Sequence, residues 1–249
     1  MDIVNIIILF VGGILAGLFG ASVGSGGLVT IPLLLFVGLP IQTTIATNRF
    51  GAVFLEFASA LRYYKEKKLN FKLGLVFGII ASVGSVIGAN IVLNIDERYL
   101  KLITAVLLVV VFLFLMYKSK IGLKDKKISK KNWIIASIGV FIFGIYGGFF
   151  GTGFGTFIMF VFLYFGIDFV KSAAISRVVG VIMSFVATIV FMINGAINYK
   201  YAVSLGLGLA IGGWIGAGLG VKIGNKYIKI LFISIILITI LKLLYESFI

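Results

Sequence analysis

Long apolar runs, separated by short polar segments, make up almost the whole chain. A helix needs about 20 apolar residues to cross about 30 Å of hydrocarbon. Runs of about this length or longer lie at 2–38, 43–64, 72–94, 99–117, 132–165, 169–192, 201–221 and 228–245. The pattern predicts an all-α polytopic membrane protein with eight apolar blocks.

The eight blocks form two similar sets of four. Arg49 returns as Arg177, and the spacing between them, 177 − 49 = 128, also relates Gly84 to Gly212. Such a spacing indicates a duplicated unit. The predicted units are a first membrane repeat at 1–117, a basic cytoplasmic linker at 118–131 and a second membrane repeat at 132–249.

The first block of each repeat is too long for a single crossing. At 1.5 Å per residue, residues 2–38 would form a helix of roughly 55 Å. Glycine clusters at 20–27 and 147–155 interrupt the two blocks. Irregular backbone at membrane depth is tolerated where protein or a water-filled cavity surrounds it. Each block is therefore predicted to form a helix, a glycine-rich turn and a short re-entrant half-helix.

The composition excludes several classes of protein. Hydrophobic residues make up 61% of the chain and charged residues 12%, with a mean hydropathy of +1.21, which is too little polar surface for a water-soluble globule. Histidine and cysteine are absent, which excludes imidazole or thiolate metal sites and Ser-His-Asp catalysis. We expect no cofactor and no enzymatic activity. The chain also contains no ATP-binding motif of the form Gly-x-x-x-x-Gly-Lys-Ser/Thr.

The net charge of +14 comes mostly from lysines between the apolar blocks. This placement is typical of cytoplasmic loops and not of nucleic-acid binding. If the glycine breaks turn the chain back, the basic loops lie together on one side, which favours inverted repeats, as in many secondary transporters. Parallel repeats give a less uneven division, and both topologies satisfy the positive-inside rule. The cytoplasmic segments of the inverted topology are 62–72, 117–131, 166–171 and 222–229.

Arg49 and Arg177 lie inside apolar blocks, not in loops. An intramembrane arginine costs about 2.5 kcal/mol or more, so it normally faces the protein interior and has a partner. One interpretation is that each planar guanidinium binds an oxyanion, with Thr47, Asn48 and Ser176 as polar neighbours. The other is a structural bond to helix-end carbonyls or an extended side chain at the interface. Recurrence in both repeats favours anion binding.

The glycine breaks offer a second anion-binding element. A helix that begins just after a break directs its free N–H groups and the positive end of its dipole into the protein. The candidate residues are Ser25, Gly26, Gly27, Thr152, Gly153 and Gly155. Close helix packing is the alternative for glycine in membrane helices. We prefer packing for Gly84, Ser85, Gly88, Gly212, Gly213, Gly216, Gly218 and Gly220.

Glu56 is a carboxylate near the middle of an apolar block, seven residues after Arg49. This spacing places the two side chains on nearly the same helical face. Glu56 is a candidate proton-coupling group. Alternatively, it compensates the charge of Arg49 or faces Arg62 near the interface. Ser184 occupies the equivalent position in the second repeat.

The glycine breaks and the arginine-bearing helices resemble those of the TauE/SafE family of membrane permeases, also described as sulfite exporters. The similar stretches are GLFGASVGSGGLVTIPL at 17–33, TIATNR at 44–49, GSVIGA at 84–89 and GGWIGA at 212–217. The resemblance extends over almost the whole chain. It implies a transporter that moves small sulfur-containing anions, such as sulfite or organosulfonates, outward. Glu56 departs from the family's pattern, and so does the second break, which no proline follows.

We predict a multi-pass plasma membrane transporter whose central site lies between the two broken helices and includes Arg49 and Arg177. Alternating movement of the repeats would expose a bound anion to each side of the membrane. A passive anion channel, or a permease for another small anion, is the main alternative, and a scaffold or a membrane-embedded enzyme is a third. The expected partners are the lipid bilayer and a small anionic substrate. Homo-oligomerisation stays open.

Overall fold

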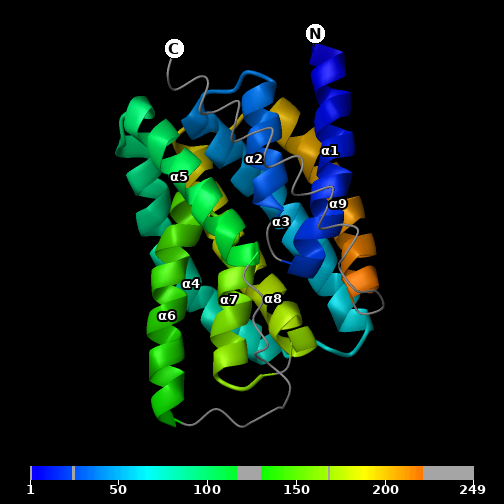
Figure 1. The fold of residues 1–249 in the computed structure, drawn as a ribbon, viewed down its shortest axis with the longest axis vertical. Coiled ribbons are helices and arrows are strands. Elements are labelled where there is room, and N and C mark those ends of the chain that lie inside the picture. Colours follow the sequence, from blue (N-terminus) through cyan, green and yellow to red (C-terminus); the bar gives the residue numbers. More distant parts are fainter. Residues whose placement is uncertain (1, 24–25, 117–129, 168, 221–249) are drawn as a thin grey trace.

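The computed structural model describes residues 2–23, 26–116, 130–167 and 169–220. Over these residues all regular structure is helical (Figure 1), which confirms the predicted helical class. The predicted block at 228–245 and most of the linker at 118–131 lie outside the described residues. The helices are α1 (Asp2–Val23), α2 (Gly27–Phe36), α3 (Ile41–Lys65), α4 (Phe71–Asn94), α5 (Glu97–Met116), α6 (Lys130–Phe149), α7 (Phe154–Tyr164), α8 (Phe169–Ile193) and α9 (Tyr199–Gly220).

Each glycine cluster separates a long helix from a short one, as the sequence predicts. α1 is followed by α2, which has 10 residues, and α6 is followed by α7, which has 11. At 1.5 Å per residue, each short helix extends only about 15 Å. Neither of them can cross a bilayer alone.

Five of the described helices are long and apolar enough to cross a membrane. They are α1, α4, α6, α8 and α9. The sequence pattern predicts eight apolar blocks. α3 has 25 residues, but it is less apolar than these five because it contains Gln42, Asn48, Arg49 and Glu56.

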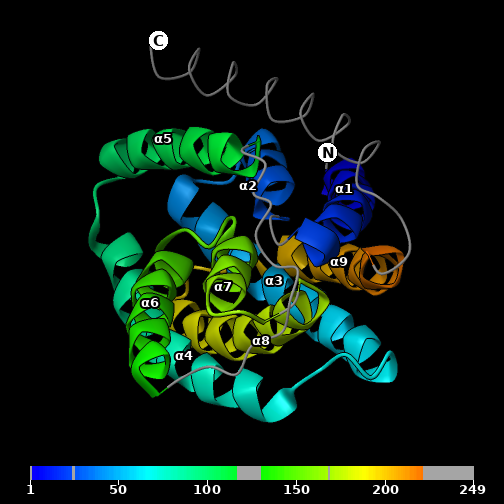
Figure 2. The same cartoon turned by 60° about the horizontal axis from the view of Figure 1, so that its bottom comes forward.

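Glycines allow α1 to pack tightly against α9 and α4 against α6 (Figure 2). A Cβ atom at Gly17 would lie 2.7 Å from the Leu209 carbonyl oxygen of α9. A Cβ atom at Gly84 would overlap the backbone of α6 at Phe141. Helix backbones can approach this closely because glycine has no side chain. The predicted packing role is confirmed for Gly84, Gly88, Gly212, Gly213 and Gly216.

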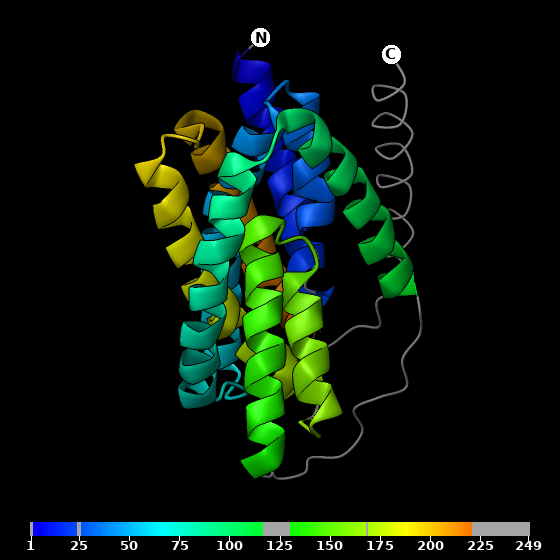
Figure 3. The same ribbon diagram turned by 90° about the vertical axis from the view of Figure 1, so that its left-hand side faces the viewer.

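The first helices of the two halves of the chain run in opposite directions (Figure 3). α1 begins at the end of the molecule marked N, whereas α6 begins at the opposite end. The connection between α3 and α4 lies at the end where α6 begins, and the connection between α8 and α9 lies at the other. Both pairs packed through glycine, α1 with α9 and α4 with α6, run parallel.

α3 and α8 lie at the centre of the helix assembly (Figure 2). They contact each other, and between them they contact the seven other described helices. The outer faces carry exposed apolar side chains, for example Ile79 and Val83 of α4, as expected for surfaces that face lipid. The buried charged side chains, by contrast, lie on α3 and α8. The candidate site is therefore at the centre of the protein.

Candidate functional site

Three buried ionic side chains lie on the two central helices. Arg49 and Glu56 belong to α3 and are 2% and 7% exposed, and Arg177 belongs to α8 and is 1% exposed. Removing a charge from water is costly unless a partner of opposite charge or several hydrogen bonds compensate for it. The partners of these three side chains therefore decide what the site can do.

The Arg49 guanidinium is bound by neutral groups only, among the described residues. Nη1 donates to the Ser184 hydroxyl at 3.2 Å, and Nη2 donates to the Phe150 carbonyl oxygen at 3.3 Å. Nε is buried and has no hydrogen-bond partner in the described part of the chain. The positive charge of Arg49 is solvated by the protein but not neutralised.

Gly151 makes room for that guanidinium. Its φ of +74° lies in the left-handed region that favours glycine. A Cβ atom at this position would overlap Nη2 of Arg49. The second glycine break therefore serves two purposes: it turns the chain and it lets Arg49 approach the backbone.

The Arg177 guanidinium forms an ion pair. Its Nη1 lies 2.9 Å from Oε2 of Glu56 and also donates to the Gly20 carbonyl oxygen at 3.2 Å. Its Nη2 donates to the Ser176 hydroxyl at 3.4 Å. Glu56 fits because Gly180 faces it: a Cβ atom at Gly180 would lie 2.7 Å from Cδ of the carboxyl group. Arg177 is thus neutralised within the protein.

The two arginines are bound in a reciprocal way. Each guanidinium contacts the glycine break of the other half of the chain and one side chain of the opposite central helix. The spacing of 128 that relates Arg49 to Arg177 also relates Glu56 to Ser184, since 184 − 56 = 128. Equivalent positions therefore hold the two arginines, but one position provides a carboxylate and the other a hydroxyl.

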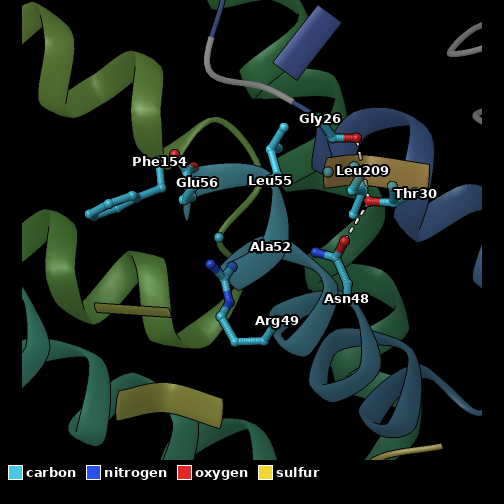
Figure 4. A pocket seen from close by; sticks show the side chains of 11 residues that line it. Gly26, Thr30, Asn48, Arg49, Ala52, Leu55, Glu56, Phe154 and Leu209 are labelled. Atoms are coloured by element: carbon cyan, nitrogen blue, oxygen red, sulfur yellow. Dashed lines mark hydrogen bonds between the residues drawn. The ribbon is translucent and has the colours of Figure 1, made fainter. Parts of the chain in front are cut away.

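A cavity of about 30 Å³ lies beside Arg49 (Figure 4). By the same measure a water molecule needs about 10–15 Å³, so the cavity has room for about two. Figure 4 shows the Arg49 guanidinium pointing from α3 into this space. The lining residues are Gly26, Gly27, Thr30, Asn48, Arg49, Ala52, Leu55, Glu56, Gly151, Phe154 and Leu209.

Polar groups of α2 and α3 face the cavity next to Arg49. Thr30 Oγ1 donates to Oδ1 of Asn48 and lies 3.4 Å from the Gly26 carbonyl oxygen. This orients Asn48 so that its amide NH₂, which has no partner among the described residues, is free to donate. In the first turn of α2, the Val29 and Thr30 amides donate to the Gly26 carbonyl oxygen at 3.0 and 3.2 Å. The amide of Gly27, the first residue of α2 and a lining residue, is left without an acceptor in the helix. The lining is therefore rich in donors.

The two glycine breaks touch each other at the edge of the cavity. A Cβ atom at Gly27 would lie 2.5 Å from Oγ1 of Thr152. This hydroxyl is buried and has no hydrogen-bond partner in the described part of the chain. The Tyr146 hydroxyl donates to the Thr152 carbonyl oxygen at 2.6 Å and holds the second break in place. Because Gly27 lines the cavity, the two breaks meet beside it.

Five of the twelve predicted site residues line the cavity, namely Gly26, Gly27, Asn48, Arg49 and Glu56. Six others do not. Thr47 accepts a hydrogen bond from the Asn198 backbone N–H at 3.1 Å and so supports the start of α9. The rest surround the second break or Arg177: Thr152, Gly153, Gly155, Ser176 and Arg177. Ser25 lies outside the described residues.

Besides the apolar lining residues Ala52, Leu55, Phe154 and Leu209, three residues that contact the predicted site residues are absent from the predicted set: Thr30, Gly151 and Ser184. Ser184 could have been found from the sequence, because it is the equivalent of Glu56 in the second half. Gly151 belongs to the second glycine cluster, but nothing in the sequence singles it out there. Thr30 is a lone polar residue in an apolar half-helix and gives no signal.

No three histidine, cysteine, aspartate or glutamate side chains converge in the described part of the chain. The cavity instead presents one carboxylate and one free cation among hydrogen-bond donors. A polytopic helical assembly with a buried, charged cavity between two broken helices has the architecture of a membrane transport protein.

The comparison with known families agrees with this class. Residues 9–243 match the family described as sulfite exporter TauE/SafE, and the chain belongs to this family. It is a multi-pass membrane transporter. The predicted resemblance is thereby confirmed.

Individual relatives have similar descriptions. A probable membrane transporter protein of Sinorhizobium sp is 29% identical, over 77% of this chain and 74% of the relative. The probable membrane transporter protein YfcA of Escherichia coli (strain K12) is 25% identical, over 96% and 90%. Sulfite exporter TauE/SafE family protein 6 of Arabidopsis thaliana is 35% identical, over 32% and 18%. No solved structure matches the chain at a significant level.

Proposed function

We propose that this protein is a secondary transporter that exports a small sulfur-containing oxyanion, and that the anion binds in the cavity against Arg49. The observation that carries the proposal is the state of Arg49. It is buried, it lines the cavity, and no carboxylate pairs with it among the described residues. A bound anion would supply the missing negative charge.

The donors around the cavity suit an oxyanion. A guanidinium presents planar N–H donors that match the oxygens of a sulfite or sulfonate group. The Asn48 side-chain amide and the Gly27 backbone amide at the start of α2 add donors on another side of the same space. The description of the family as sulfite exporters and the name of the Arabidopsis thaliana relative support a sulfur oxyanion as substrate. They also favour transport over enzymatic activity.

Binding would require the cavity to enlarge, because a space for about two waters is too small for a sulfonate. In the proposed cycle the contact between Gly27 and Thr152 opens, so that the two broken helices separate. The halves of the chain would then rock around the site and expose it to either side. The described arrangement corresponds to the closed stage of this cycle.

We further propose that the membrane repeats at 1–117 and 132–249 are inverted and that the segment 118–131 joins them in the cytoplasm. The opposite directions of α1 and α6 support this topology. So does the reciprocal binding of Arg49 and Arg177, which is expected of two units related by a pseudo-two-fold axis in the membrane plane.

Because the chain contains no cysteine, single introduced cysteines can test the topology. Lys68 lies in the exposed connection between α3 and α4, and Asn194 follows α8 and is also exposed. In intact cells, a membrane-impermeant thiol reagent should label Asn194→Cys, and it should label Lys68→Cys only after permeabilisation. Labelling of both positions from the same side would contradict inverted repeats.

Transport can be tested with purified protein in liposomes. We expect uptake of sulfite and of methanesulfonate that saturates and is stimulated by the same anion on the trans side. Arg49→Gln should lower the uptake by about tenfold or more, the equivalent of about 1.4 kcal/mol. Arg98→Gln, the same substitution at an exposed arginine of α5, is the matched control. Unchanged uptake in Arg49→Gln would refute the site, and uptake without trans-stimulation would identify a channel.

A further inference from the structure

We propose that Glu56 makes the site selective for anions that carry one negative charge and excludes dianions. This inference rests on the proposed anion site at Arg49 and adds the charge class of the substrate. Glu56 is a lining residue of the same cavity as Arg49. Arg177 does not line the cavity, and it meets the carboxylate of Glu56 at 2.9 Å.

The two halves of the site provide an internal comparison. Arg49 donates to a hydroxyl, that of Ser184, whereas Arg177 is paired with a carboxylate at the equivalent position. The geometry of the two pairs is alike, with separations of 3.2 and 2.9 Å. The difference between them is therefore one negative charge, and it lies at Glu56.

This difference sets the charge that a substrate meets. The charged groups of the described central helices that are buried at the site are Arg49, Arg177 and Glu56, which together carry one positive charge. Two tyrosines are also near, and phenols are neutral at physiological pH. The Tyr63 hydroxyl donates to the Ala21 carbonyl oxygen at 3.4 Å, and the Tyr146 hydroxyl donates to Thr152. Neither phenol adds a charge to the site.

A monoanion would bring the buried charge to zero. A dianion would leave one negative charge uncompensated in a poorly solvated space, which is strongly unfavourable. It would also lie in the same small cavity as the Glu56 carboxylate and be repelled by it. Discrimination of this kind, by an element that repels the wrong ligand, is a common source of specificity. The carboxylate thus selects by charge while the arginine binds.

Methanesulfonate and sulfate are suitable probes, because they have the same tetrahedral shape and keep charges of one and two at neutral pH. Initial uptake of each would be measured in proteoliposomes at pH 7.5. In the wild-type protein we expect methanesulfonate to enter about tenfold faster than sulfate or more. Glu56→Gln should lower this ratio by a similar factor, since it raises the buried charge to two. Glu97→Gln, at an exposed ion pair with Lys101, should leave the ratio unchanged.

A double variant separates charge from structure. Glu56→Gln combined with Arg177→Gln removes the ion pair but restores one net positive charge, so the ratio should return toward the wild-type value. It also avoids an unpaired Arg177, which threatens the folding of the single variant. A structural role of Glu56 alone would change the uptake of both anions equally in the two variants. That result would overturn the proposal.

The wild-type measurement decides the matter even if both variants fail to fold. Sulfate uptake equal to or faster than methanesulfonate uptake would overturn the charge selectivity and leave the proposed anion site standing. A folded Glu56→Gln protein that takes up methanesulfonate and keeps the wild-type ratio of methanesulfonate to sulfate uptake would also overturn the charge selectivity. It would likewise leave the proposed anion site standing. Absence of uptake of methanesulfonate, sulfite and sulfate alike would overturn the proposed function, and the charge selectivity with it.

Discussion

Arg49 and Arg177 lie at equivalent positions of α3 and α8, but they meet different partners. Arg177 is neutralised by Glu56 at 2.9 Å, whereas Arg49 donates to the Ser184 hydroxyl at 3.2 Å and to a backbone carbonyl. Both are almost completely buried. Two copies of one arrangement can therefore diverge through a single pair of residues. One cation is then paired with a carboxylate, and the other is held by neutral groups among the described residues.

The two glycine breaks differ in a similar way. The residue before α2, Gly26, has φ −54°, whereas the residue before α7, Gly153, has φ +78°. In the second break the first amide of α7, that of Phe154, donates to the Gly151 carbonyl oxygen at 3.1 Å. Both breaks line the cavity, the first with Gly26 and Gly27 and the second with Gly151. Only the second has a glycine, Gly151, at which a Cβ atom would overlap an arginine guanidinium. The asymmetry of the breaks thus matches that of the arginines.

The strongest test of this comparison is to neutralise each arginine in turn. Arg177→Gln leaves the Glu56 carboxylate buried without a cation, and we expect it to lower the free energy of unfolding by about 3–5 kcal/mol. Arg49→Gln leaves no buried carboxylate unpaired and should cost less. Chemical unfolding of the two purified variants in detergent would rank them. The opposite order would mean that Arg49, not Arg177, is the structural cation.

A second test concerns the space that glycine leaves for Arg49. Gly151 and Gly195 both have positive φ, +74° and +62°, but a Cβ atom at Gly195 would meet nothing within 4 Å. Gly195→Ala should therefore lower the free energy of unfolding by only about 1–2 kcal/mol, the cost of placing an alanine in the left-handed backbone region. Gly151→Ala should cost more and also displace Arg49, so that methanesulfonate uptake falls by about tenfold or more. Equal effects of the two substitutions on stability and uptake would contradict the role of Gly151.

A third test gives Arg49 the kind of partner that Arg177 has. Ser184→Asp introduces a carboxylate beside Arg49, as Glu56 lies beside Arg177. This should neutralise Arg49 and lower methanesulfonate uptake by about tenfold. Ser184→Asn is the control, because asparagine has the size of aspartate without its charge. This variant should retain most of the uptake. If the two variants behave alike in the liposome assay, the free charge of Arg49 is not what binds the anion.

The smallest effects are expected at the polar neighbours of the two arginines. Asn48→Ala removes an amide donor from the cavity and should weaken anion affinity by about five- to tenfold, the equivalent of about 1–1.4 kcal/mol. Ser176→Ala removes a contact of 3.4 Å with Arg177, away from the cavity. It should lower the unfolding free energy by about 0.5–1 kcal/mol and change the affinity little. Binding and unfolding measurements on both variants would show whether the neighbours differ as their arginines do.

Much of the architecture could be predicted from the sequence because it depends on local composition. Apolar runs determine the helices, and glycine clusters mark where α1 and α6 end and the short helices begin. The burial of Arg49 and Arg177 also followed from their place inside apolar blocks, and both are indeed buried. Of the eight predicted apolar blocks, five correspond to helices long and apolar enough to cross a membrane, and the block at 228–245 lies outside the described residues. α3 is less apolar because of its polar residues.

Which residues form the candidate site was harder to predict, because this depends on contacts between residues far apart in the chain. The sequence suggested that Glu56 compensates its helical neighbour Arg49 or faces Arg62, but its ion pair is with Arg177 of α8. Spacing along one helix indicates which side chains share a face, not which helix lies opposite. For the same reason the sequence did not indicate that Thr47, predicted as a polar neighbour of Arg49, accepts a hydrogen bond at the start of α9.

From the sequence came the helical membrane class, the two glycine breaks and the two arginines inside apolar segments, because hydropathy and composition are local properties. Only the tertiary structure decided that the two arginines are not equivalent. Their partners come from the opposite central helix, Ser184 for Arg49 and Glu56 for Arg177. Which cation is neutralised depends on how α3 and α8 pack across the centre of the protein, and long-range packing is what a linear pattern does not contain.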